Sequence, residues 1–151
     1  MDEIDNRILR ELQKDGRLPN NMLAEKVGLS PSPCLRRVKQ LEESGAIDRY
    51  VAIVNPVTLG LNLSIFVRIW LDSQGEETVE HFCREIRTLP EVVECHLMVG
   101  DCDFILRVVA ADLNAYRQFQ IKHLARIKGV QSMKTELPMQ TIKHSTELPI
   151  R

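Results

Sequence analysis

Every second residue along residues 61–72 is aliphatic, and this pattern limits the possible folds more than any other feature of the chain. The aliphatic residues are Leu61, Leu63, Ile65, Val67, Ile69 and Leu71. A period of two places these side chains on one face of a β-strand. Since that face is uniformly apolar, we expect helices to cover it.

The rest of the C-terminal half supplies both the helices and the partner strands. Residues 76–89 and 112–127 carry apolar side chains at helical spacing. Strand-like runs occupy residues 92–99, 103–110 and 130–142. The predicted order is therefore βαββαβ, which is the order of a ferredoxin-like domain.

A sheet with helices on one face leaves its second face uncovered. Phe66, Trp70 and Met98 are predicted to lie on that second face. Such a face is more apolar than a monomer usually exposes to water. We therefore expect the sheets of two copies to pack together in a homodimer.

The N-terminal half has helical rather than alternating periodicity. Helices are predicted over residues 2–14 and 20–27, and a third begins at Ser30 and closes at Gly45. The short turn at residues 28–30 makes the last two a helix-turn-helix. The extended residues that follow suit a small wing. The fold class is thus α+β: a winged helix-turn-helix domain at residues 1–54, a linker at 55–60 and a ferredoxin-like domain at 61–151.

Charge is distributed unevenly along the chain. The formal net charge is −1, which argues against a wholly basic nucleic-acid coat protein. Between residues 17 and 41, however, five basic residues accompany a single acidic residue. The exposed side of the predicted third helix carries Ser32, Arg36, Arg37, Lys39 and Gln40. Such a row is often only a solvated surface, but the tight turn and the proline-rich start of the helix favour DNA binding.

Residues 100–103 form the loop between the two predicted central strands, and they have two interpretations. Glycine and aspartate are ordinary residues of a hairpin turn. Alternatively, backbone N–H groups of the turn and the carboxylates of Asp101 and Asp103 could bind both ends of a zwitterion. Because Cys102 lies in this turn, we expect it to be the one exposed cysteine.

Motifs for metal binding and catalysis are missing from the sequence. The four cysteines have no C-x-x-C spacing, and no two of the four histidines are four residues apart. There is no glycine-rich phosphate loop and no recognisable nucleophile motif. We predict no metal, no cofactor and no enzyme activity, although a small metabolite-converting enzyme is kept as a third hypothesis. With no secretory signal and no apolar stretch of membrane-spanning length, a cytoplasmic location is expected and no membrane contact.

Several strings of residues resemble one known family over essentially the whole chain. In the N-terminal half they are Ile4-Asp5-x-x-Ile8-Leu9, Leu12-Gln13-Lys14-Asp15-Gly16-Arg17, Val27-Gly28-Leu29-Ser30-Pro31-x-Pro33-Cys34-x-x-Arg37-Val38 and Leu41-Glu42-x-x-Gly45-x-Ile47. In the C-terminal half they are Glu94-Cys95-His96-Leu97 and Gly100-Asp101-x-Asp103-Phe104-x-Leu106. The chain resembles the leucine-responsive regulatory protein and asparagine regulator family, or Lrp/AsnC family, of transcription regulators.

This resemblance implies a dimer that assembles further, commonly to an octamer, on double-stranded DNA. The DNA-contacting positions that it implies are Arg17, Asn20, Ser32, Pro33, Arg36, Arg37 and Lys39. It also implies a free amino acid bound between effector domains. Leucine or methionine is expected first, because apolar side chains such as Met98 lie beside the loop. The effector-binding positions are His96, Met98, Gly100, Asp101 and Asp103. A ligand-independent protein that bridges DNA remains the alternative function.

Overall fold

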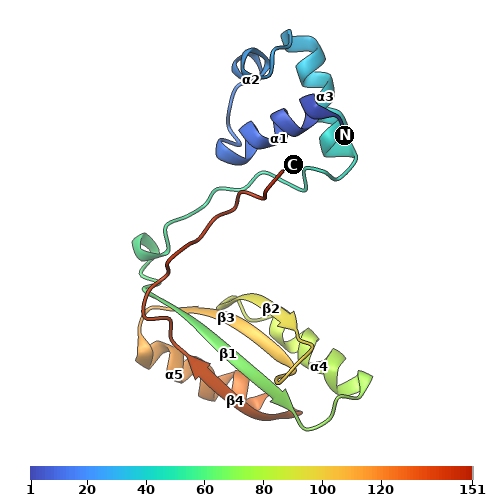
Figure 1. Cartoon of the computed structure of the whole chain (residues 1–151). Helices are drawn as coiled ribbons and strands as arrows, with labels where there is room; N and C mark the ends of the chain where they lie inside the picture. The colour runs from blue at the N-terminus through green and yellow to red at the C-terminus, as the bar shows by residue number, and fades with distance from the viewer. Residues whose placement is uncertain (151) are drawn as a thin grey trace. The chain divides into compact units, whose positions relative to one another are not determined.

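The computed structural model describes residues 1–150, which form two compact units (Figure 1). Residues 1–53 and 142–150 make up the first unit, and residues 54–141 make up the second. The division falls beside the predicted linker. Residues 142–150, which we expected to be part of the domain of residues 61–151, group with the first unit.

Three helices build the first unit: α1 (Glu3–Lys14), α2 (Asn20–Val27) and α3 (Pro31–Glu43). The Asp2 side chain accepts a hydrogen bond from the Asp5 backbone, and the Asp5 side chain accepts one from Asp2, so a capping box starts α1. Six apolar residues form the core of this unit: Ile8, Leu23, Ala24, Val27, Cys34 and Leu41.

A sharp turn separates α2 from α3, as the sequence predicted. Gly28 ends α2 in the left-handed conformation with φ of 75°, which glycine adopts without steric cost. The N–H of Leu29 then donates to the carbonyl of Ala24 at 2.9 Å. Pro31 stands in the first turn of α3, where its missing N–H removes no helical hydrogen bond. The helix-turn-helix prediction is confirmed by this geometry.

The segment after α3 contains no strand of its own. Residues 48–55 have neither helical nor strand structure, although we expected a small wing there. The Tyr50 hydroxyl donates to Glu42 at 3.0 Å and holds the start of the segment against the end of α3. A short helix, η1 (Pro56–Leu59), occupies the predicted linker.

The second unit has the predicted βαββαβ order. Its elements are β1 (Leu63–Leu71), α4 (Glu76–Arg87), β2 (Val92–Leu97), β3 (Phe104–Ala110), α5 (Leu113–Lys122), η2 (Leu124–Arg126) and β4 (Val130–Glu136). The antiparallel sheet has the order β2-β3-β1-β4, and both long helices lie against one of its faces (Figure 1). The predicted strand at 130–142 ends earlier, at residue 136, because Pro138 has no N–H for a ladder.

Alternation in β1 separates the two faces of the sheet as predicted. Ile65, Val67 and Ile69 are fully buried under the helices, where the rings of Phe82 and Phe104 lie 4.5 Å apart. Phe66, Arg68 and Trp70 point to the other face and are only partly buried. None of the helices that residues 1–150 form is long and apolar enough to cross a membrane.

Candidate functional site

The exposed face of α3 carries the first group of predicted site residues. Ser32, Arg36 and Lys39 follow one another at intervals of four and three residues, which places them on one side of the helix. All three are exposed, and within residues 1–150 neither Arg36 nor Lys39 has an ion-pair partner. Pro33 is partly buried beside them. This face therefore presents two uncommitted cations to solvent.

Arg37, in contrast, is engaged inside the unit. Its guanidinium nitrogen Nη1 lies 2.7 Å from Asp2 Oδ2 and 2.7 Å from Asp5 Oδ1. The backbone N–H of Asp5, and after it the Arg37 side chain, hold the pKa of Asp2 below its ordinary value. Arg37 thus ties α3 to the start of α1, a role that the sequence analysis did not identify.

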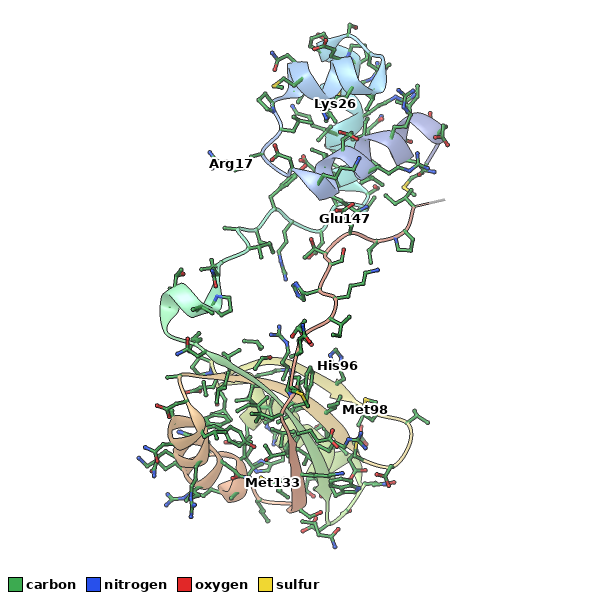
Figure 2. The ribbon with its side chains drawn as sticks, turned by 60° about the vertical axis from the view of Figure 1, so that its left-hand side comes forward. Arg17, Lys26, His96, Met98, Met133 and Glu147 are labelled. Carbon is green, nitrogen blue, oxygen red and sulfur yellow. The ribbon has the colours of Figure 1, made fainter. Side chains whose placement is uncertain are left out.

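Asn20 and Arg17 precede the turn between α2 and α3. One of these side chains is bound within the unit and the other extends into solvent. The Asn20 amide donates to the carbonyl of Pro31 at 2.8 Å and fixes the start of α2 to the start of α3. Arg17 is exposed, and Figure 2 shows its side chain extending away from the helices. The Arg17 side chain therefore extends into solvent, whereas the Asn20 side chain positions the start of α3.

The loop of residues 98–103, hereafter the effector loop, is anchored to β1. The indole Nε1 of Trp70 donates to the carbonyl of Asp101 at 2.6 Å. The N–H of Asp103 donates to the carbonyl of Ile69 at 2.9 Å, and the carbonyl of Asp103 accepts from Met98 at 2.9 Å. These contacts hold the loop in one conformation without using its outer groups.

The two predicted aspartates of the effector loop differ in availability. Both oxygens of Asp103 are occupied, by the N–H of Leu71 at 2.7 Å and by the amide of Gln74 at 2.9 Å. The Asp101 side chain is 81% exposed, and its carboxylate is 3.9 Å from Arg68 Nη1. Asp103 is thus an internal anchor, and Asp101 is the carboxylate that faces outward.

Backbone geometry explains the glycine in this loop. Gly100 has φ of 151°, which side chains rarely adopt, and nothing lies within 4 Å of the position that a Cβ would occupy. Within residues 1–150, no hydrogen bond is donated by the N–H groups of Gly100, Asp101 or Cys102. These three N–H groups are therefore not used as donors within the described part of the chain, and the Asp101 side chain beside them is exposed.

The remaining predicted residues are His96, which lies just before this loop, and Met98, which is its first residue. His96 Nε2 is 3.7 Å from Glu94 Oε2, and Met98 is 40% exposed; Figure 2 shows both on the same part of the unit. An Arg107 hydrogen bond holds the pKa of Glu94 below its ordinary value. The expectation for Cys102 was wrong, because its side chain is turned inward and buried.

Sequence analysis missed the residues that anchor the effector loop: Arg68, Trp70 and Gln74. Trp70 is the single tryptophan of the chain and stands among the polar residues of the alternating strand. This unusual placement could have indicated a specific role for Trp70. No group of three or more potential metal ligands occurs in the described part of the chain.

Comparisons with known proteins agree with this geometry. Residues 1–48 match a winged helix-turn-helix DNA-binding family, and residues 64–148 match the Lrp/AsnC ligand-binding domain. The chain is 42% identical over 151 residues to the leucine-responsive regulatory protein of Escherichia coli K12, covering 100% of this chain and 92% of that protein.

Solved structures are similar over almost the full length. A transcriptional regulator from Neisseria meningitidis, solved in complex with L-methionine, has a TM-score of 0.95 and 39% identity, covering 99% of this chain and 96% of that one. An AsnC family regulator from Agrobacterium tumefaciens has a TM-score of 0.93 and 42% identity, covering 99% and 97%. The chain therefore belongs to the Lrp/AsnC family of transcription regulators and combines a helix-turn-helix DNA-binding unit with an amino-acid-binding unit.

Proposed function

We propose that this regulator reads DNA with the exposed face of α3 and changes its assembly or DNA affinity when leucine or methionine binds at the effector loop. The exposed, unpaired cations Arg36 and Lys39 of α3 support the DNA-binding half of the proposal. The open N–H groups beside Asp101 carry the second half. The bound L-methionine of the Neisseria regulator and the name of the E. coli relative favour these two amino acids.

DNA recognition follows from the placement of Ser32, Arg36 and Lys39. A helix of this kind enters the major groove, where arginine and lysine contact guanine edges or phosphates. Arg17 reaches the DNA backbone from the loop before α2, whereas Arg37 and Asn20 hold the helices in register. In a dimer, two such helices lie about 34 Å apart, so the operator is an imperfect palindrome.

In this proposal, the effector loop binds both charged groups of the amino acid, its carboxylate and its ammonium group. The N–H groups of residues 100–102 donate to the ligand carboxylate, and the exposed Asp101 carboxylate receives its ammonium group. Met98 and its neighbours contact the apolar side chain. Asp103 acts by holding the loop, since its own oxygens are already occupied.

Assembly couples the two activities. The uncovered sheet face with Phe66 and Trp70 packs against a second copy, and dimers join into a larger ring, proposed to be an octamer. An effector bound between subunits alters transcription only through unequal affinity for the assembly states. We also propose a cytoplasmic location and no enzyme activity, consistent with relatives that are transcription regulators.

Two arginine variants test the DNA half. Affinity for a DNA fragment selected from a random pool is measured by fluorescence anisotropy at fixed salt. Arg36→Ala is expected to weaken binding by about tenfold or more without lowering Tm, since it removes an outward contact. Arg37→Ala is expected to lower the Tm of the first unit, because Asp2 and Asp5 lose their cation. Arg117→Ala, in the second unit, is the control, and unchanged affinity of Arg36→Ala at low salt contradicts the proposal.

A thermal-shift screen against the twenty amino acids tests the effector half. A ligand at one hundred times its Kd stabilises the native state by about 2.7 kcal/mol. Asp101→Asn is expected to abolish the shift while leaving the fold intact, and Glu80→Gln on α4 is the control with an unrelated exposed carboxylate. If no amino acid shifts a protein that still binds DNA, the ligand-independent bridging function replaces this half of the proposal.

A further inference from the structure

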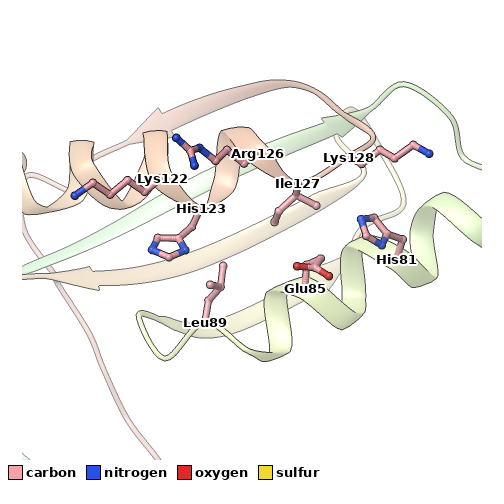
Figure 3. Close-up of a pocket in the computed structure, with 8 residues that line it drawn as sticks. All are labelled: His81, Glu85, Leu89, Lys122, His123, Arg126, Ile127 and Lys128. Atoms are coloured by element: carbon pink, nitrogen blue, oxygen red, sulfur yellow. The ribbon is translucent and has the colours of Figure 1, made fainter.

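A cleft on the helical side of the second unit shares no residue with the effector loop or with α3. It lies between α4 and the segment that leads from the end of α5 through η2 into β4, and its volume is about 290 Å³ (Figure 3). A neighbouring hollow of about 400 Å³ shares His81 and Lys128 with it. We name the first of these the α4–η2 cleft.

Cations outnumber anions around this cleft. Lys122, Arg126 and Lys128 line it, and Glu85 is the one carboxylate among its lining residues. None of the three cations has an ion-pair partner within residues 1–150, whereas Arg68 and Arg107 on the sheet are paired. With three cations and one carboxylate, this concave surface has a net positive charge and concentrates positive potential.

The interior of the cleft is less polar than its rim. Ile127 is 8% exposed, and Leu89 is partly buried on the opposite wall. Figure 3 shows Ile127 and His123 pointing toward α4, with Lys122 and Lys128 at opposite ends. The His123 ring stacks on Phe119 with centroids 5.4 Å apart, which keeps the imidazole at the wall. The cleft thus offers a short apolar floor between positive ends.

We propose that the α4–η2 cleft binds a small phosphorylated metabolite. Three permanent cations suit a group that carries two negative charges, and arginine and lysine are the usual protein partners of phosphate. A free amino acid matches this lining less well, since it brings one carboxylate to three cations and only Glu85 is available for its ammonium group. The organic part of the metabolite contacts Leu89 and Ile127. The cleft therefore selects a ligand of different charge from the effector.

Binding here would give the regulator a second input. α4 follows β1 directly, and β1 anchors the effector loop through Ile69 and Trp70. A ligand that holds α4 against η2 therefore acts on the element that supports the effector loop. This regulatory role rests on the proposed function, whereas the binding itself does not.

Isothermal titration of the full chain with inorganic pyrophosphate tests the cleft. We expect saturable binding of one pyrophosphate per chain, weakened at least tenfold in the Arg126→Gln, Lys128→Gln double variant. Lys134→Gln is the matched control, since Lys134 lies on β4 and not in the cleft. Glu85→Gln is expected to tighten binding severalfold, because it removes the one carboxylate of the lining.

Each other outcome overturns the proposal. Non-saturable binding, or equal loss in Lys134→Gln and the double variant, means that pyrophosphate senses only general surface charge. Loss of DNA affinity in the double variant, without any pyrophosphate binding to the native chain, means that the cleft contacts the DNA backbone. The amino-acid thermal shift is measured on the same variants, so that failure of the effector proposal is seen separately.

Discussion

The two units of the chain are stabilised by different means. Within residues 1–150, the core of the second unit contains 14 buried apolar residues, and the core of the first contains six. Small cores supply little stabilisation, so small domains depend on additional interactions. The first unit has such interactions on its surface: Arg37 with Asp2 and Asp5, Glu11 with Lys26, and Gln13 with residue 148.

This difference predicts how each unit responds to change. The sheet unit should be sensitive chiefly to lost volume, because its core is the larger of the two. The helical unit should be sensitive to lost volume and to pH, because polar contacts at its surface supplement its small core. The following variants test that contrast, from the largest expected effect to the smallest.

Phe82→Ala should cause the largest loss. Phe82 is fully buried and packs its ring against Phe104 at the centre of the sheet unit. Phenylalanine-to-alanine changes in cores cost about 3–5 kcal/mol. Urea unfolding followed by the fluorescence of Trp70, the single tryptophan, reports this unit directly. Val99→Ala, at a fully exposed position, is the control, and an equally small effect of both variants would contradict the assigned core.

Ile8→Ala should have a comparable or smaller effect, limited to the first unit. Ile8 is fully buried among α1, α2 and α3, and such a truncation costs about 2–5 kcal/mol. Because the core around it is small, we expect loss of DNA binding at temperatures where the native protein binds. Trp70 fluorescence should report an unchanged second unit. A matching shift in the Trp70 transition would show that the two units unfold together.

Sequence periodicity was sufficient to predict the fold, for a physical reason. Burial of one strand face or one helix stripe leaves a regular pattern, which the residues of β1 carry in full. The glycine turn before α3 was equally direct, because a left-handed residue is needed there. The end of β4 was missed, although Pro138 marks it, because the apolar pattern continued past the proline.

The roles of individual site residues could not be predicted in the same way. Arg37 is predicted to contact DNA; the partners that it has within the chain, Asp2 and Asp5, lie more than thirty positions earlier. Asp103 is predicted to bind the ligand; within the chain its carboxylate accepts hydrogen bonds from Leu71 and Gln74. A helical or strand period states which face a residue occupies. It does not state which distant side chain arrives at that face.

Gln13→Ala tests the contact between α1 and the end of the chain. The Gln13 amide donates to the Leu148 carbonyl at 3.2 Å, and its oxygen accepts from the Leu148 N–H at 2.6 Å. Exposed hydrogen bonds contribute little each, so we expect a loss of about 1 kcal/mol from the first unit. Removal of residues 142–151 should produce a similar loss. The truncation is made both in the native chain and in the Gln13→Ala variant. A loss of stability only in the native chain confirms the contact, and an equal loss in both contradicts it.

Glu11 provides the smallest and most specific test, because its effect depends on pH. Its two carboxylate oxygens lie 2.8 Å from Lys14 Nζ and 2.8 Å from Lys26 Nζ. The Lys14 hydrogen bond, followed by that of Lys26, lowers the pKa of Glu11 from 4.5 to about 2. A depressed pKa in the folded state adds stability above the unfolded pKa, and this stability is lost as pH falls through the folded value.

Stabilisation by Glu11 should therefore be complete above pH 4.5 and disappear between pH 4.5 and about 2. The Tm of the first unit is compared in the native chain and in Glu11→Gln across this range. We expect the difference to shrink toward zero as pH falls and to decrease in high salt, since both ion pairs are near the surface. Glu25→Gln, an exposed α2 glutamate with no ion pair within residues 1–150, should show no such trend. A pH-independent difference for Glu11→Gln would mean that the side chain stabilises α1 by packing and that its ion pairs add nothing to the stability of the first unit.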